Sequence, residues 1–137
     1  MVLASMSRKS PRNRHAVSIV ELPEFEASSL RLLDSNTLRA LHLLLADNPL
    51  AGSKVPGYSG LLELKFAGYR VLYSVGTRFT KIFLIRLLEP GETLPGPTSE
   101  DGKTLRKALD VLVKGGMVLA AKELFKAAWE LIRDGFF

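Results

Sequence analysis

The chain has 137 residues, of which 47% are hydrophobic and 24% charged, so it has the composition of one globular domain and not of a disordered chain. Its formal net charge of +5 fits an RNA or another polyanionic partner, although many ordinary proteins share it. With no cysteine and two histidines, disulfides and thiolate metal sites are excluded, and we expect neither metal nor cofactor. Because no apolar run could span a bilayer and no secretory signal is evident, we expect a cytoplasmic protein without a membrane partner.

Residues 1–15 are rich in serine, arginine and lysine and show no periodicity. Such a segment is typical of a flexible basic arm. The arm could contact RNA, or it could be a segment without a function of its own, or a mis-assigned start, ahead of the folded domain. The sequence does not decide between these interpretations.

Two helices are expected after a short β-type run at 17–22. Pro23 suits the first turn of a helix that we expect to end near Leu33, and Asp34 can cap the next helix over 36–47. Asn48-Pro49 ends that second helix. Because the connection is so short, the two helices should form an antiparallel hairpin.

Three strands are expected next, at 62–66, 69–75 and 81–88. The first alternates apolar and charged residues, and turns at Ala67-Gly68 and Gly76 separate the three. The third is apolar on both faces until Arg86, which is typical of a central strand. Short turns between consecutive strands predict an antiparallel meander.

Two further helices are expected beyond the loop at 89–99. The first, over 102–114, places Lys103, Lys107 and Lys114 on one side, either as a solvated face or as a surface that docks on RNA. Gly115-Gly116 ends it. The last helix, over 117–134, has an apolar side with Phe125 and Trp129 that is wider than a surface helix needs. That side could pack on its own domain, on a second copy in a homodimer, or on a protein partner.

The remaining residues able to support chemistry are cationic side chains on the expected sheet. They are Lys65 on the first strand, Arg70 and Tyr73 on the second, and Lys81 and Arg86 on the third, with Arg78 near the turn between the last two. RNA can be cleaved without metal when the 2′-hydroxyl attacks its own phosphate, and fixed arginine and lysine side chains can stabilise the charge that builds on phosphorus. Cations on a sheet are also often mere solvated surface or salt-bridge partners. His42 lies beside Leu38 and Leu45 and is better interpreted as a packed histidine than as a catalytic one.

The sequence resembles the RelE/HigB superfamily of bacterial toxins over about residues 17–114. The resemblance rests on Asn48-Pro49, on Val55-Pro56-Gly57, on the strand that contains Lys65, and on the run Gly68-Tyr69-Arg70-Val71-Leu72-Tyr73. It implies an α+β fold in which an N-terminal helix hairpin packs on a small, twisted antiparallel sheet, followed by C-terminal helices. It divides the chain into a basic arm at 1–15, a toxin-like domain at 16–114 and a helical extension at 115–137.

The resemblance also implies a function. The ribonucleases of this superfamily are ribosome-dependent mRNA endoribonucleases of type II toxin–antitoxin systems, so the resemblance implies an antitoxin, the ribosome and mRNA as partners. Lys65 and Arg70 match basic residues of the family, Tyr73 matches a family tyrosine, and Arg86 is the nearest substitute for a later basic residue. We therefore expect catalytic roles for these four. Alternation along the strand would, however, place Tyr73 on the other face of the sheet from Arg70, where its role would be structural.

RNA-binding roles are expected for the other cations of the sheet turn and the first C-terminal helix, namely Lys81, Arg78, Lys103 and Lys107. The chain departs from the family pattern at 89–92, where Glu89 and Glu92 make an acidic segment. A non-catalytic relative, or one like the ParE branch that binds an antitoxin, gyrase or nucleic acid without cleaving RNA, is therefore the alternative.

Overall fold

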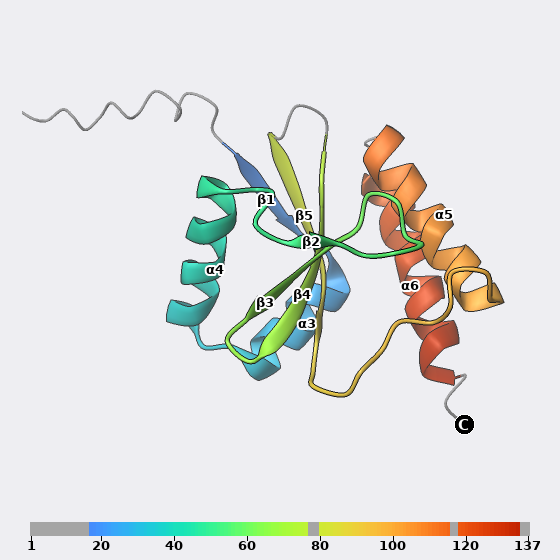
Figure 1. Ribbon diagram of the computed structural model, residues 1–137, viewed down its shortest axis with the longest axis horizontal. Coiled ribbons are helices and arrows are strands. Elements are labelled where there is room, and N and C mark those ends of the chain that lie inside the picture. The colour runs from blue at the N-terminus through green and yellow to red at the C-terminus, as the bar shows by residue number, and fades with distance from the viewer. Residues whose placement is uncertain (1–16, 77–79, 116–117, 135–137) are drawn as a thin grey trace, which may run out of the picture.

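A computed structural model describes residues 17–76, 80–115 and 118–134 (Figure 1). The expected arm at 1–15 and Arg78 lie outside these described residues. In the described part, the strands form one five-stranded sheet in the order β1-β5-β4-β3-β2. The strands are β1 (Ser18–Glu21), β2 (Ser53–Lys54), β3 (Leu62–Phe66), β4 (Tyr69–Val75) and β5 (Lys81–Leu88).

The sheet is mixed, so the expectation of a purely antiparallel sheet is wrong. β2, β3, β4 and β5 pair antiparallel, as the meander predicts, but β1 pairs parallel to β5, with Ser18 opposite Lys81 and Glu21 opposite Leu84. The physical reason lies in β5, whose residues are mostly buried on both faces and which therefore needs a neighbour on each edge. β1 supplies the second neighbour.

Helices cover both faces of the sheet (Figure 1). They are α3 (Pro23–Leu32), α4 (Ser35–Asp47), α5 (Glu100–Gly115) and α6 (Val118–Asp134). Asp34 caps α4, because its carboxylate accepts a hydrogen bond of 2.7 Å from the backbone N–H of Thr37, and this bond lowers the pKa of Asp34. The bounds of the four helices agree with the sequence predictions to within two residues.

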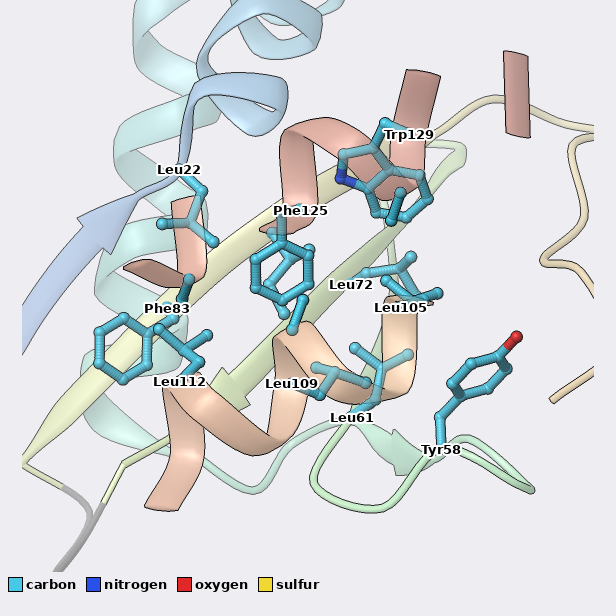
Figure 2. Close-up of a cluster of buried hydrophobic side chains, with 14 of the residues drawn as sticks. Leu22, Tyr58, Leu61, Leu72, Phe83, Leu105, Leu109, Leu112, Phe125 and Trp129 are labelled. Carbon is cyan, nitrogen blue, oxygen red and sulfur yellow. The ribbon is translucent and has the colours of Figure 1, made fainter. Parts of the chain in front are cut away.

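Two hydrophobic clusters fill the spaces between the sheet and the helices. On the α3–α4 side, Phe25 and Leu41 pack against Val71 and Tyr73 of β4. On the α5–α6 side lies the larger cluster, shown in Figure 2, to which α6 contributes Phe125 and Trp129 and α5 contributes Leu105, Leu109 and Leu112. The apolar side of α6 therefore packs on its own domain, while a homodimer through this helix stays a prediction.

A bulge in β5 decides which face Arg86 occupies. The register pairs Leu72 with Arg86 but Tyr73 with Leu84, so Ile85 is an extra residue on β5. Strict alternation from Ile85 would place Arg86 on the α3–α4 face. The bulge instead places Arg86 opposite Leu72, a member of the cluster on the α5–α6 side.

Candidate functional site

Three cations predicted to be catalytic lie on one face of the sheet. Lys65 of β3 is directly opposite Arg70 of β4, Arg70 is opposite Leu88 of β5, and Arg86 lies two residues before Leu88. Residues directly opposite each other in an antiparallel pair project to the same face. We call Lys65, Arg70 and Arg86 the sheet cluster.

Arg70 is held by acceptors on both sides. Its Nη1 atom lies 3.2 Å from Oε2 of Glu63, and its Nη2 atom donates to the backbone carbonyl of Glu92. Arg70 and Glu63 are each 28% exposed, so this ion pair is partly screened by solvent. The charge of Arg70 is thus already balanced by a neighbour, and an incoming phosphate would have to compete with Glu63.

Arg86 is held more fully than Arg70. Its Nη1 atom lies 3.4 Å from Oε2 of Glu24 on α3, and its Nη2 atom lies 3.4 Å from Oε2 of Glu92. Its guanidinium carbon lies 4.8 Å from the ring centroid of Trp129 on α6, within the range of a cation–π contact. Arg86 therefore joins α3, α6 and the loop after β5.

Trp129 is 4% exposed, and its indole N–H is buried without a hydrogen-bond partner among the described residues. The side chain comes from α6 and lies above the sheet beside Phe125 and Leu72 (Figure 2). Its contact with Arg86 is therefore made through the ring and not through a hydrogen bond.

Lys65 differs from the two arginines because it is exposed and has no ion-pair or hydrogen-bond partner among the described residues. A depression of about 390 Å³ over the β3–β4 turn is bordered by Lys65 and Arg70. A second depression, of about 380 Å³, is bordered by Arg86, Glu92 and Trp129, and both include Leu88 in their lining. The sheet cluster is thus reached from solvent at two neighbouring places.

Tyr73 lies apart from the sheet cluster. It projects to the α3–α4 side, is fully buried, and its hydroxyl donates to the carbonyl of Pro49 at 2.9 Å and accepts from the N–H of Gly52 at 2.8 Å. Burial raises its pKa, and the Gly52 hydrogen bond opposes that rise. A Cβ at position 52 would lie 2.9 Å from the Tyr73 hydroxyl oxygen, which explains the glycine there. This geometry gives Tyr73 a structural role and leaves it no path to a substrate on the sheet cluster.

The cations predicted to bind RNA fall into separate places. Lys81 begins β5, five residues before Arg86, or roughly 16 Å along the strand. Lys103 and Lys107 are exposed on α5 and line one depression of about 410 Å³ together with Arg106 and Lys114. We call Lys103, Arg106, Lys107 and Lys114 the α5 groove.

In the described part of the chain, no group of three or more histidine, cysteine, aspartate or glutamate side chains could hold a metal ion. His42 lies on α4, and its Nε2 atom is 2.7 Å from Oε2 of Glu21 on β1. Among helices within the described ranges, none is long and apolar enough to cross a membrane.

Sequence reasoning missed the partners of the arginines. Glu24 is separated from Arg86 by 62 residues, and nothing in either sequence neighbourhood indicates the contact. Glu92 was visible as an acidic departure from the family pattern, and Glu63 as a charged residue on the same strand as Lys65. The alternation of β3 was the available signal for Glu63, because it places Glu63 and Lys65 on the same face.

Comparisons with known proteins find similarity among solved structures. No model of a protein family matches the chain, and no curated protein matches it. A mutant of the Escherichia coli toxin RelE in the free state is 20% identical to this chain, with a TM-score of 0.43. The similarity covers 56% of this chain and 85% of that one.

Proposed function

We propose that the chain is a RelE/HigB-like toxin of a type II toxin–antitoxin system and that it cleaves mRNA on the ribosome without a metal ion. The observation that carries the proposal is the cross-strand pair of Lys65 and Arg70 beside an open depression, with Arg86 on the same face. The run from Gly68 to Tyr73, on which the sequence resemblance partly rests, supplies Arg70 itself.

The proposed chemistry is transfer of the phosphodiester to the neighbouring 2′-oxygen. A bond forms between the 2′-oxygen and phosphorus, and the bond from phosphorus to the 5′-oxygen breaks. Glu63 can accept the proton of the 2′-hydroxyl, Arg70 can stabilise the equatorial oxygens, and the Lys65 ammonium can donate a proton to the leaving 5′-oxygen. Arg86 has a positioning role, because it pairs with the side chain of Glu92, whose backbone carbonyl accepts a hydrogen bond from Arg70.

The second candidate function is a non-catalytic protein of the same kind that binds an antitoxin, gyrase or nucleic acid. It is favoured by one observation, namely that both arginines of the sheet cluster are already paired with glutamates. Under either function we propose a cytoplasmic protein with an antitoxin as its protein partner.

Expression of the chain without an antitoxin tests the proposal. We expect growth to stop and full-length mRNA to be depleted, and Lys65→Ala or Arg70→Ala to relieve both effects. The loss of a preorganised charge-stabilising group costs about 10² to 10³ in rate. Lys126→Ala, on the exposed side of α6, is the matched control and should stay toxic.

The two functions give different results in this experiment. Growth arrest with intact mRNA would favour the non-catalytic function and contradict cleavage. A soluble, folded Lys65→Ala protein that depletes mRNA as the parent does would show that the sheet cluster is not the site.

A further inference from the structure

We propose that the α5 groove, together with the apolar depression beside it, is a binding site for single-stranded RNA that is distinct from the sheet cluster. This inference rests on the proposed function only in taking RNA as the partner. Its evidence is the charge of the groove, the shape of its neighbour and the rigidity of the segments that line both.

The charge of the α5 groove is largely uncompensated. Its lining holds four cations and one carboxylate, Asp110, which pairs with Lys114 at 2.9 Å. Lys103 lies 3.8 Å from Glu100, but both side chains are well exposed, so the pair contributes little. Lys107 has no partner among the described residues, and Arg106 donates only to the carbonyl of Pro97. The arginines of the sheet cluster are matched by carboxylates, whereas these two cations are free to bind phosphate.

An apolar depression of about 650 Å³ adjoins the α5 groove. The two depressions share Ser59, Gly60 and Arg106 in their linings. The larger one is otherwise lined mainly by apolar side chains, including Leu50, which is 56% exposed, and Val55. The planar guanidinium of Arg106 thus stands between a basic surface and an apolar one, and arginine both stacks on bases and pairs with phosphates.

The walls of these depressions are fixed by packing. Tyr58 is buried, and its hydroxyl donates to the carbonyl of Pro95 at 2.5 Å. Gly57 has a φ of +83°, and a Cβ there would lie 2.3 Å from Cγ of Pro97. The loop before β3 and the loop before α5 are therefore held together, so a ligand would meet a preformed surface and lose less free energy to ordering.

These features favour an unpaired strand over a duplex. Phosphates would lie along the lysines of α5, and an unstacked base would occupy the apolar depression. A base-paired strand cannot supply such a base. The apolar depression includes Leu62 in its lining, and Leu62 lies opposite Tyr73, so it projects to the other face of the sheet from Lys65. A strand held in the α5 groove would thus leave the sheet cluster uncovered.

Fluorescence anisotropy tests the site with a labelled single-stranded RNA of about 12 nucleotides. The Arg70→Ala protein serves as the background, so that the probe is not cleaved. The affinity is measured over a series of salt concentrations for this protein, for Lys103→Glu with Lys107→Glu, and for Lys122→Glu with Lys126→Glu. The last pair makes the same charge change on α6, and thermal melts confirm that each protein is folded.

We expect the α5 double variant to bind at least about tenfold more weakly at low salt. Its plot of log affinity against log salt concentration should become shallower by about 1.4, which is about 0.7 for each of two phosphates. The α6 double variant should weaken binding less than about threefold. A duplex of the same sequence should bind the background protein more weakly than the single strand does.

Equal losses in the two double variants would overturn the inference, because they would show a general charge effect. Duplex binding as tight as single-strand binding would overturn the base-binding part. Failure here is distinguishable from failure of the proposed function. If the α5 double variant loses RNA affinity but the parent depletes no mRNA, this inference stands and cleavage is rejected. If the parent depletes mRNA but the α5 double variant binds RNA as tightly as the background protein, cleavage stands and this inference is rejected.

Discussion

The sheet cluster and the α5 groove both consist of lysine and arginine, but their charges are in different states. Arg70 and Arg86 are about three-quarters buried and each has a carboxylate partner. Lys107 is exposed on α5 and has no partner among the described residues. The comparison shows that a set of cations on one face is not by itself a phosphate site, because the partners decide what each cation can still bind.

Phe125→Ala should have the largest effect on the free energy of unfolding. It tests whether α6 is part of the hydrophobic core or packs only loosely on the domain. Phe125 is buried in the larger cluster, and truncating such a side chain destabilises a protein by about 3–5 kcal/mol. Urea denaturation measures the loss, with Lys126→Ala as the control. A loss below about 1 kcal/mol would mean that α6 does not belong to the core.

Arg86→Ala should have the next effect, since it leaves Glu24 and Glu92 without their shared partner. We expect a loss of about 1–3 kcal/mol, below the cost of breaking a fully buried pair because solvent reaches all three side chains. Trp129 is the sole tryptophan, so its fluorescence should change with the loss of the cation above its ring. An unchanged spectrum together with unchanged stability would show that Arg86 does not make these contacts.

Tyr73→Phe tests the opposite face of the sheet, where the structure gives tyrosine a structural role. Removal of the hydroxyl leaves the Gly52 N–H and the Pro49 carbonyl unpaired, and we expect a loss of about 1–3 kcal/mol with cleavage retained. Loss of cleavage in a stably folded variant would place Tyr73 in the catalytic site instead.

The difference in stability between the parent and the Tyr73→Phe variant should change with pH in a definite direction. Burial raises the pKa of Tyr73 above its ordinary value of 10.0, so above that pH the unfolded chain loses the phenol proton while the folded chain keeps it. The stability that the phenol contributes is therefore complete below pH 10 and decreases as the pH rises further. The difference in unfolding free energy between parent and variant should shrink above pH 10, and a difference that grows would contradict the burial argument.

Lys107→Ala should have the smallest effect on stability, within about 0.5 kcal/mol, because it removes no hydrogen bond or ion pair among the described residues. The same substitution should weaken the binding of single-stranded RNA. A stability loss comparable to that of Arg86→Ala would remove the contrast between the two regions.

Local patterns predicted most of the secondary structure. The strand at Leu62–Phe66 follows from alternation, and the central place of β5 follows from its two apolar faces. Tyr73 could be assigned to the side opposite Arg70 by counting along β4. These features depend on neighbours in the sequence, which is why the sequence alone reveals them.

Long-range features could not be predicted in the same way. The parallel pairing of β1 with β5 joins segments about 60 residues apart, as does the contact of Glu24 with Arg86. The bulge at Ile85 has no signal in the sequence, although it is what brings Arg86 to the face of Arg70. The place of Arg86 on the same face as Lys65 and Arg70 therefore depends on an irregularity that strict alternation along β5 does not predict.

The central claim is that the sheet cluster carries the chemistry while the α5 groove carries binding. The most direct test measures mRNA cleavage in a translation extract as a function of protein concentration, for the parent, for Lys65→Ala, and for Lys103→Glu with Lys107→Glu. The account predicts that Lys65→Ala lowers the saturating rate by about 10² or more, whereas the α5 double variant mainly raises the concentration needed for half of that rate. A Lys65→Ala protein that reaches the parent's saturating rate would contradict the account.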